Sequence, residues 1–193
     1  MPSFARYPVF LKLEEKACLV VGGGPVGERK AMALIDSGAK VTVVSPEATP
    51  GLQGEERLNW TARDFDESDL DDKVLAVAAT DSDRVNASVV AAARQRGVWV
   101  NDATSADRSD FILPATVNRG GLTLAVSTQG GSPAYAKLVR QMLESEFGDE
   151  HAEMVALLTE LRPRVRATFP ESRDRRTFWD RVATEETLSL IKS

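Results

Sequence analysis

A glycine-rich turn that directly follows an apolar run constrains this chain more than any other feature. Residues 17–21 are apolar and of strand length, and the turn after them has the spacing Gly22-x-Gly24-x-x-Gly27. The first glycine permits a tight turn, the second a close approach of backbone to a ligand, and the third close packing of helix on strand. Pro25 suits the first helical position, where a missing N–H costs little. The helix that begins here offers free amides and a positive dipole end, which favour the phosphates of a dinucleotide.

The residues after this turn complete a βαβ unit. Ala31, Leu34 and Ile35 have helical spacing, Gly38 ends the helix, and residues 40–44 predict a second strand. The unit has the length expected of a dinucleotide-binding motif, about thirty residues. This context favours nucleotide binding over the alternative, a tight strand–helix turn that holds no ligand.

The rest of the N-terminal half alternates between expected strands and helices. The expected strands are residues 58–62, 73–79 and 98–100, the expected helices are a short acidic one at 66–72 and a longer one at 85–96, and residues 45–51 are expected to be a loop. Short connections in this order predict the α/β class, with a Rossmann-like, doubly wound and mostly parallel sheet.

Ligands in such folds bind beyond the carboxyl ends of the strands. The loops that leave these ends are Gly22–Gly27, Ser45–Glu47, Ala79–Asp81 and Asn101–Thr104. We therefore expect them to line one crevice. The residues expected to contact a cofactor there are Gly22, Gly24, Pro25, Val26, Gly27, Ser45, Pro46, Glu47, Thr80 and Asp81.

The end of the second strand bears on which cofactor is bound. An acidic residue usually stands there and holds the adenosine ribose. This chain has Ser45 instead, Glu47 lies three residues past the strand, and no arginine follows immediately to hold a 2′-phosphate. The sequence therefore favours NAD over NADP, and FAD is less favoured because no further flavin-binding signal is present.

The pattern changes after about residue 110. Residues 111–117 and 122–127 predict two strands joined by a turn at Asn118–Gly121, and Ser132-Pro133 predicts the start of a helix over 134–147. Two more helices are expected at about 150–167 and 172–190, with Pro170 between them. The expected domains are residues 1–113, which bind the nucleotide, 114–147, a strand pair plus helix, and 148–193, a helical region.

Composition excludes several classes of function. The net charge of −5 argues against a nucleic-acid partner, and the longest apolar stretches are too short to span a membrane. Met1–Phe4 is not followed by a signal-type apolar core, so we expect a cytoplasmic protein. The single cysteine, Cys18, is expected to be a buried inert thiol, and the single histidine, His151, a surface residue. No cluster of metal ligands and no Ser-His-Asp set is present, so neither a resident metal nor a nucleophilic triad is expected.

Several further motifs carry a resemblance to a known family. They are Cys18–Lys30, which includes Gly27-Glu28-Arg29-Lys30, Ala78–Asp81 followed by Val85-Asn86, Phe111–Ala115, Leu124–Thr128, Ser132-Pro133 with Lys137–Arg140, and Arg176-x-Phe178-Trp179. In combination they resemble the dehydrogenase family of siroheme synthases over nearly the whole chain. The chain is similar to a precorrin-2 dehydrogenase without the methyltransferase domain that some relatives carry.

The resemblance implies NAD-dependent oxidation of precorrin-2 to sirohydrochlorin on the route to siroheme. It also implies a homodimer in which residues 114–147 form a dimerisation region exchanged between subunits, with residues 148–193 beside the tetrapyrrole cleft. Because precorrin-2 carries many carboxylates, arginines and helix N-termini are expected to bind it. Arg119, Thr128 and Ser132 are the expected substrate contacts, and seven arginines between Arg162 and Arg181 are further candidates.

One position departs from the family pattern. The family usually has a catalytic aspartate three residues after the asparagine that matches Asn101, and this chain has Thr104 there. Asp102 lies two residues earlier, so along a strand its side chain points the same way. We therefore expect Asp102 and Thr104 to be the catalytic residues. Asp102 would take the proton lost from the macrocycle or stabilise the charge left by hydride departure. Ferrous-iron insertion, which some relatives perform, is more doubtful here because the usual carboxylate is missing.

Two other classes of function remain open. One is a nucleotide-sensing regulatory module, which needs the glycine turn but no substrate cleft. The other is an oxidoreductase that acts on a different acidic small molecule. A precorrin-2-dependent change in NADH absorbance separates both from the dehydrogenase.

Overall fold

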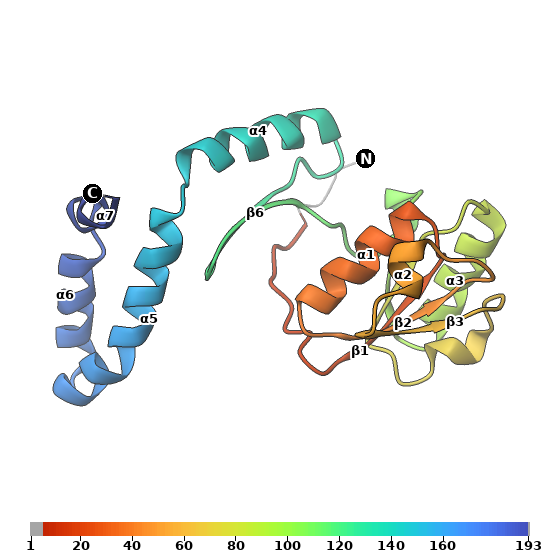
Figure 1. Ribbon diagram of the computed structural model, residues 1–193, viewed down its shortest axis with the longest axis horizontal. Coiled ribbons are helices and arrows are strands. Elements are labelled where there is room, and N and C mark those ends of the chain that lie inside the picture. Colours follow the sequence, from red (N-terminus) through yellow and green to blue (C-terminus); the bar gives the residue numbers. More distant parts are fainter. Residues whose placement is uncertain (1–5, 193) are drawn as a thin grey trace. The chain divides into compact units, whose positions relative to one another are not determined.

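The computed structural model describes residues 6–192 (Figure 1). The chain divides into two compact units, Met1–Leu113 and Pro114–Ser193. The expectation based on Met1–Phe4 lies outside the described residues.

The first unit is built on a five-stranded sheet. Its strands are β1 (Ala17–Val21), β2 (Lys40–Val44), β3 (Leu58–Thr61), β4 (Leu75–Ala78) and β5 (Trp99–Asp102). Their order is β3-β2-β1-β4-β5, and every neighbouring pair is parallel. The predicted Rossmann-like sheet is therefore confirmed, and the chain reverses its winding direction between β1 and β4.

Hydrophobic cores on both faces of this sheet explain why its central strands are almost continuously apolar. Leu19 and Val21 pack in the core that includes α3 (Asp83–Gln95), whereas Cys18 and Val20 pack in the core that includes α1 (Pro25–Asp36). Successive side chains of a strand point to opposite faces, which produces this division. Cys18 is buried, as expected, and burial raises the pKa of its thiol to about 11, which disfavours the reactive thiolate.

A short helix, α2 (Pro50–Gln53), lies where a loop was expected, so that prediction was wrong in part. Thr49 accepts a hydrogen bond from the Leu52 amide through Oγ1 at 3.4 Å, and Pro50 occupies the first helical position. The proline starts a helical turn here rather than ending regular structure. Two 3₁₀ turns complete the unit, η1 (Glu67–Leu70) within the expected acidic helix and η2 (Ala106–Arg108) after β5.

The second unit begins with an antiparallel hairpin of β6 (Ala115–Arg119) and β7 (Leu122–Val126). Arg119 pairs with Leu122, so the turn contains only Gly120 and Gly121, and Gly120 has a φ of 53° that favours glycine. The hairpin was predicted, but its first strand begins at Ala115 rather than at residue 111. Pro114 lies just before the strand, and Asn118 and Arg119 extend it into the expected turn.

Helices form the rest of the second unit: α4 (Pro133–Glu146), α5 (Glu150–Thr168), α6 (Ser172–Val182) and α7 (Glu185–Lys192). The single helix expected over 172–190 is wrong, because the chain breaks at Ala183 and Thr184. Thr184 Oγ1 accepts a hydrogen bond from the Thr187 amide at 3.2 Å and so caps a new helix. His151 is half-buried, with its ring 4.7 Å from that of Phe147. Within residues 6–192, no helix is long and apolar enough to cross a membrane.

Candidate functional site

Backbone hydrogen bonds bring three loops together at the carboxyl edge of the parallel sheet. The ladder continues one residue beyond each strand: Gly22 N donates to Val44 O at 3.0 Å, Ala79 N to Val21 O at 2.8 Å, and Ala103 N to Ala78 O at 2.9 Å. The glycine turn, the loop after β4 and the loop after β5 are therefore neighbours. They lie at the reversal between β1 and β4, where nucleotides bind in this class of fold.

Packing explains why two residues of the turn, Gly22 and Gly27, must be glycine, but it does not explain Gly24. Gly22 has a φ of 119°, and a Cβ on it would lie 2.3 Å from Ala79 O. A Cβ on Gly27 would lie 2.0 Å from Gly22 O, because α1 packs directly on the turn. A Cβ on Gly24 would meet no atom within 4 Å, and Gly24 is exposed. The space above Gly24 is therefore open for a ligand to approach the backbone.

Free backbone amides border this open space. The first hydrogen bond of α1 is donated by Glu28 N to Gly24 O at 2.9 Å. Within the described residues, the amides of Gly24, Val26 and Gly27 have no backbone acceptor, as is usual at a helix N-terminus. Together with the dipole of a 12-residue helix, these donors fit a diphosphate. The turn therefore has the shape and the polarity that a dinucleotide needs.

The loop after β2 supplies the residues expected at the adenosine end. Ser45 is half-buried, its amide donates to Thr61 O, and its carbonyl accepts a hydrogen bond from Trp60 Nε1 at 3.1 Å. Pro46 and Glu47 are exposed, and a Cβ on Gly23 would lie 2.1 Å from Glu47 O. The loop is thus held against the glycine turn while the side chain of Glu47 remains accessible.

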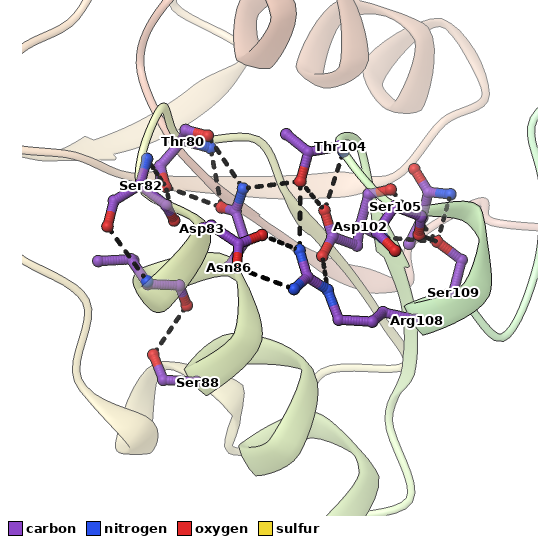
Figure 2. A network of polar contacts seen from close by, with 12 residues as sticks. Thr80, Ser82, Asp83, Asn86, Ser88, Asp102, Thr104, Ser105, Arg108 and Ser109 are labelled. Carbon is purple, nitrogen blue, oxygen red and sulfur yellow. Dashed lines mark hydrogen bonds and ion pairs between the residues drawn. The ribbon is translucent and has the colours of Figure 1, made fainter.

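A buried amide, Asn86 of α3, ties the loop after β4 to the loop after β5 (Figure 2). Its Oδ1 accepts hydrogen bonds from Thr80 N at 3.1 Å and Thr80 Oγ1 at 2.7 Å. Its Nδ2 donates to Thr80 O at 2.9 Å and to Thr104 Oγ1 at 3.4 Å. The hydroxyl of Thr80, an expected cofactor contact, therefore faces Asn86, whereas the other expected contact of this loop, Asp81, is exposed.

Asp102 and Thr104 contact each other directly. The side chain of Asp102 is 0% exposed, and its Oδ1 accepts hydrogen bonds from Thr104 N at 2.9 Å and Thr104 Oγ1 at 2.7 Å. Its Oδ2 accepts a hydrogen bond from Arg108 Nε at 2.7 Å. Burial acts to raise the pKa of Asp102, but the hydrogen bonds from Thr104 and Arg108 outweigh it, so the pKa lies below its usual value. The carboxylate is therefore ionised and already hydrogen-bonded, whereas Thr104 is exposed.

Arg108 links this pair to the start of α3 (Figure 2). Its Nη1 donates to Asp83 Oδ2 at 3.1 Å, and its Nη2 donates to Asp83 Oδ1. Hydrogen bonds to Asp83 and Asp102 raise the pKa of Arg108, and the same contact lowers the pKa of Asp83. Sequence reasoning missed Arg108 as a site residue, because its role depends on the turn η2, which folds it back over Asp102.

The substrate contacts expected in the second unit do not form one cluster within the chain. Thr128 and Ser132 lie together at the start of α4, where Ser132 N donates to Thr128 Oγ1 at 3.1 Å and Tyr135 N donates to Ser132 Oγ at 3.2 Å. Arg119 lies at the other end of α4, where it donates to Phe147 O at 2.8 Å and Glu144 O at 3.0 Å. A helix of 14 residues separates the two places by about 20 Å.

Within residues 6–192, no group of three or more histidine, cysteine, aspartate or glutamate side chains is placed to hold a metal ion. The candidate site consists of the open glycine turn and the Asp102–Thr104–Arg108 network, both in the first unit.

Three family models match successive parts of the chain. The family described as "Putative NAD(P)-binding" matches residues 9–115, "Sirohaem biosynthesis protein central" matches 119–146, and "Sirohaem synthase dimerisation region" matches 151–193. The resemblance noted above placed the dimerisation region at 114–147, whereas the family model with that description matches the helices that follow.

Curated relatives and a solved structure agree with these matches. Siroheme synthase 1 of Aeromonas salmonicida is 40% identical over 184 residues, which cover 94% of this chain and 39% of that protein. Siroheme synthase of Thioalkalivibrio sulfidiphilus is 37% identical over 190 residues, which cover 97% of this chain and 39% of that protein. The solved structure "SirC, precorrin-2 dehydrogenase" has a TM-score of 0.82 and 26% identity, over 95% of this chain and 92% of that one. The chain thus spans about two fifths of the length of these curated relatives and nearly all of the solved structure.

Proposed function

The chain belongs to the siroheme synthase family of NAD(P)-binding proteins, and from that premise we propose that it oxidises precorrin-2 to sirohydrochlorin with NAD during siroheme biosynthesis. The observation that carries the proposal is the open space at Gly24, which a Cβ would enter without touching any protein atom within 4 Å. This opening lies at the same sheet edge as Asp102 and Thr104. A precorrin-2 dehydrogenase has the same fold over nearly its whole length, which supports the choice of substrate.

The residues of the first unit fit the cofactor in a defined order along the crevice. The amides of Gly24, Val26 and Gly27 would hold the diphosphate, Ser45, Pro46 and Glu47 would hold the adenosine, and the loop with Thr80 and Asp81 would border the rest. Bound NAD supplies the hydride acceptor. The protein itself must bind, orient and polarise the substrate.

We propose different roles for the two expected catalytic residues. Thr104 is exposed, so its hydroxyl can contact the macrocycle, while the buried Asp102 fixes that hydroxyl by accepting a hydrogen bond from it at 2.7 Å. Of the two roles expected for Asp102, charge stabilisation suits the geometry better than proton transfer. Its carboxylate is closed to solvent, and three hydrogen bonds already use its two oxygens.

The matches also support a homodimer with a tetrapyrrole as ligand, since the dimerisation model covers residues 151–193. The expected divisions at 114–147 and 148–193, the substrate contacts Arg119, Thr128 and Ser132, and a cytoplasmic location all stay predictions. Thr104 in place of the usual aspartate keeps ferrochelatase activity outside the proposal.

The direct test supplies precorrin-2 and NAD to the purified chain and follows NADH absorbance. We expect NADH to form only when both are present, and its absence would refute the dehydrogenase. Gly24→Ala should abolish NAD binding, because the added methyl enters the open space and strains nothing in the protein at a φ of −76°. Gly54→Ala is the matched control, since its Cβ would meet only Pro50 O at 3.4 Å.

Variants of the network test the catalytic assignment. Thr104→Val and Asp102→Asn should each lower turnover about 10²-fold and leave the Kd for NAD unchanged. Ser105→Ala is the control. Ser105 follows Thr104 directly, and its side chain makes no capping hydrogen bond at the start of η2. Near-normal turnover in Thr104→Val would reject a role for that hydroxyl.

A further inference from the structure

The helices α5 and α6 lie side by side in the second unit (Figure 1), and residues from both line a pocket that is rich in arginine. Its volume is about 340 Å³. The residues that line it include Arg162, Val165 and Arg166 from α5 and Arg175, Arg176 and Trp179 from α6. The sequence showed a run of seven arginines here but gave no basis for ranking them, and the fold brings four of them around one hollow.

The arginines of this pocket make few contacts with carboxylates in the part of the chain that the structure describes. In residues 6–192, Arg162, Arg166 and Arg175 have no carboxylate within ion-pair distance. Arg176 approaches Asp180 only at 4.0 Å, with both side chains largely exposed. Arg162 and Arg166 are four residues apart on one helix, where like charges repel. Three of the four pocket arginines are thus without an ion pair to any described carboxylate.

One of these guanidinium groups is held in place by the backbone. Arg175 Nη1 donates to Phe169 O at 2.8 Å and to Pro170 O, the carbonyls of the connection between the two helices. These bonds use one of its three nitrogens, so Nε and Nη2 remain available as donors. A guanidinium fixed in this way is ready to bind a carboxylate through two parallel hydrogen bonds.

The pocket also has an apolar side. Val165 is 5% exposed, and Trp179 is half-buried with its ring 5.0 Å from that of Phe178. Arginines can bind the carboxylates of an organic anion, and Trp179 and Val165 offer apolar surface to the rest of it. The volume is at the lower end of the range for ligand pockets, so it suits one edge of a large ring.

We propose that this pocket binds neighbouring carboxylate side chains at one edge of the tetrapyrrole. This inference rests on the proposed function, because that function supplies a ring that carries many carboxylates. Arg162 and Arg166 hold the acidic groups from α5, Arg175 and Arg176 hold them from α6, and Trp179 lies against the ring or its apolar substituents.

The test measures binding of uroporphyrin, a porphyrin with eight carboxylates, to the full chain by quenching of tryptophan fluorescence. The double variant Arg162→Gln/Arg166→Gln should raise the Kd for uroporphyrin about tenfold or more, since charge-assisted hydrogen bonds are lost. The control Arg164→Gln/Arg173→Gln removes the same charge outside the pocket, from one position on α5 and one on α6, and its Kd should stay within about twofold of the wild-type value.

A second variant tests whether binding needs the two-pronged hydrogen bonding of a guanidinium group or only its positive charge. Arg162→Lys/Arg166→Lys keeps the charge but loses the planar fork, so its affinity should fall between those of the wild type and the glutamine variant. Equal losses in the pocket and control variants would overturn the proposal, because binding would then depend only on overall charge. An unchanged Kd in the pocket variant would overturn it as well.

Failure of the pocket proposal and failure of the proposed dehydrogenase function give different results. If uroporphyrin binds through these arginines but precorrin-2 yields no NADH, the pocket stands and the dehydrogenase assignment fails. If precorrin-2 is oxidised at the wild-type rate and KM by the pocket variant, the dehydrogenase stands and the pocket is excluded as a substrate site.

Discussion

Arg108 in the first unit and the arginines of the pocket in the second put the same side chain to opposite uses. Arg108 is bonded to Asp102 and Asp83, and the carboxylate of Asp102 is completely buried. Arg162 and Arg166 have no acidic partner in residues 6–192 and are exposed. An arginine that neutralises a buried carboxylate stabilises the fold, whereas unpaired arginines around a hollow are open to an anion from outside. The number of arginines in a segment therefore says less about its function than their pairing does.

The largest effect expected from this comparison is on the stability of the first unit. Arg108→Met leaves Asp102 buried without its cation, so the free energy of unfolding should fall by about 3 kcal/mol. Urea denaturation measures the change. The double variant Arg108→Met/Asp102→Asn should regain part of the loss, because the uncompensated charge is gone, and failure to regain any would show that the ion pair is not the cause.

A smaller effect is expected from acid. The pKa values of Asp102 and Asp83 are lowered in the folded chain, so their contribution to stability is complete above the unfolded-state value of about 4 and is lost as pH falls through the lower folded values. Stability between pH 5 and pH 2 should therefore fall less steeply in Asp102→Asn than in the wild type. Parallel curves would contradict the lowered pKa of Asp102.

The smallest effect is expected in the pocket. Arg166→Gln should change the free energy of unfolding by less than about 0.5 kcal/mol, since an exposed arginine without a partner contributes little to the fold. A slight stabilisation is the expected sign, because repulsion from Arg162 is relieved. A loss as large as that of Arg108→Met would remove the distinction between the two regions.

Sequence reasoning succeeded where local chemistry decides the structure. The spacing of Gly22, Gly24 and Gly27 has one common structural context, and the parallel sheet with its glycine turn follows from it. The same reasoning expected Asp102 and Thr104 to point the same way along a strand. The two residues do make contact, but β5 ends at Asp102 and they meet through a turn, with Asp102 buried and Thr104 exposed.

It failed where a contact depends on how a segment folds back. Arg108 reaches Asp102 and Asp83 only because η2 reverses the chain, and nothing in the spacing of these residues indicates that turn. The break at Thr184 was missed because a threonine within a polar helical pattern also reads as an ordinary helical residue. The sequence shows the arginines as a run, but which of them line the pocket depends on how α6 packs along α5.

The side-chain amide of Asn86 joins the two loops of the crevice through hydrogen bonds that do not depend on pH. Its amide holds Thr80 and Thr104 without carrying a charge, whereas the neighbouring Arg108–Asp102 contact depends on ionisation. As pH falls, these contacts should therefore be lost in two stages. Protonation of Asp102 first weakens its contact with Arg108 and loosens the segment around η2. The hydrogen bonds of Asn86 to Thr80 and Thr104 break only later, with global unfolding. Below about pH 4, the segment that holds Arg108 would thus be loosened while Asn86 still joins Thr80 to Thr104.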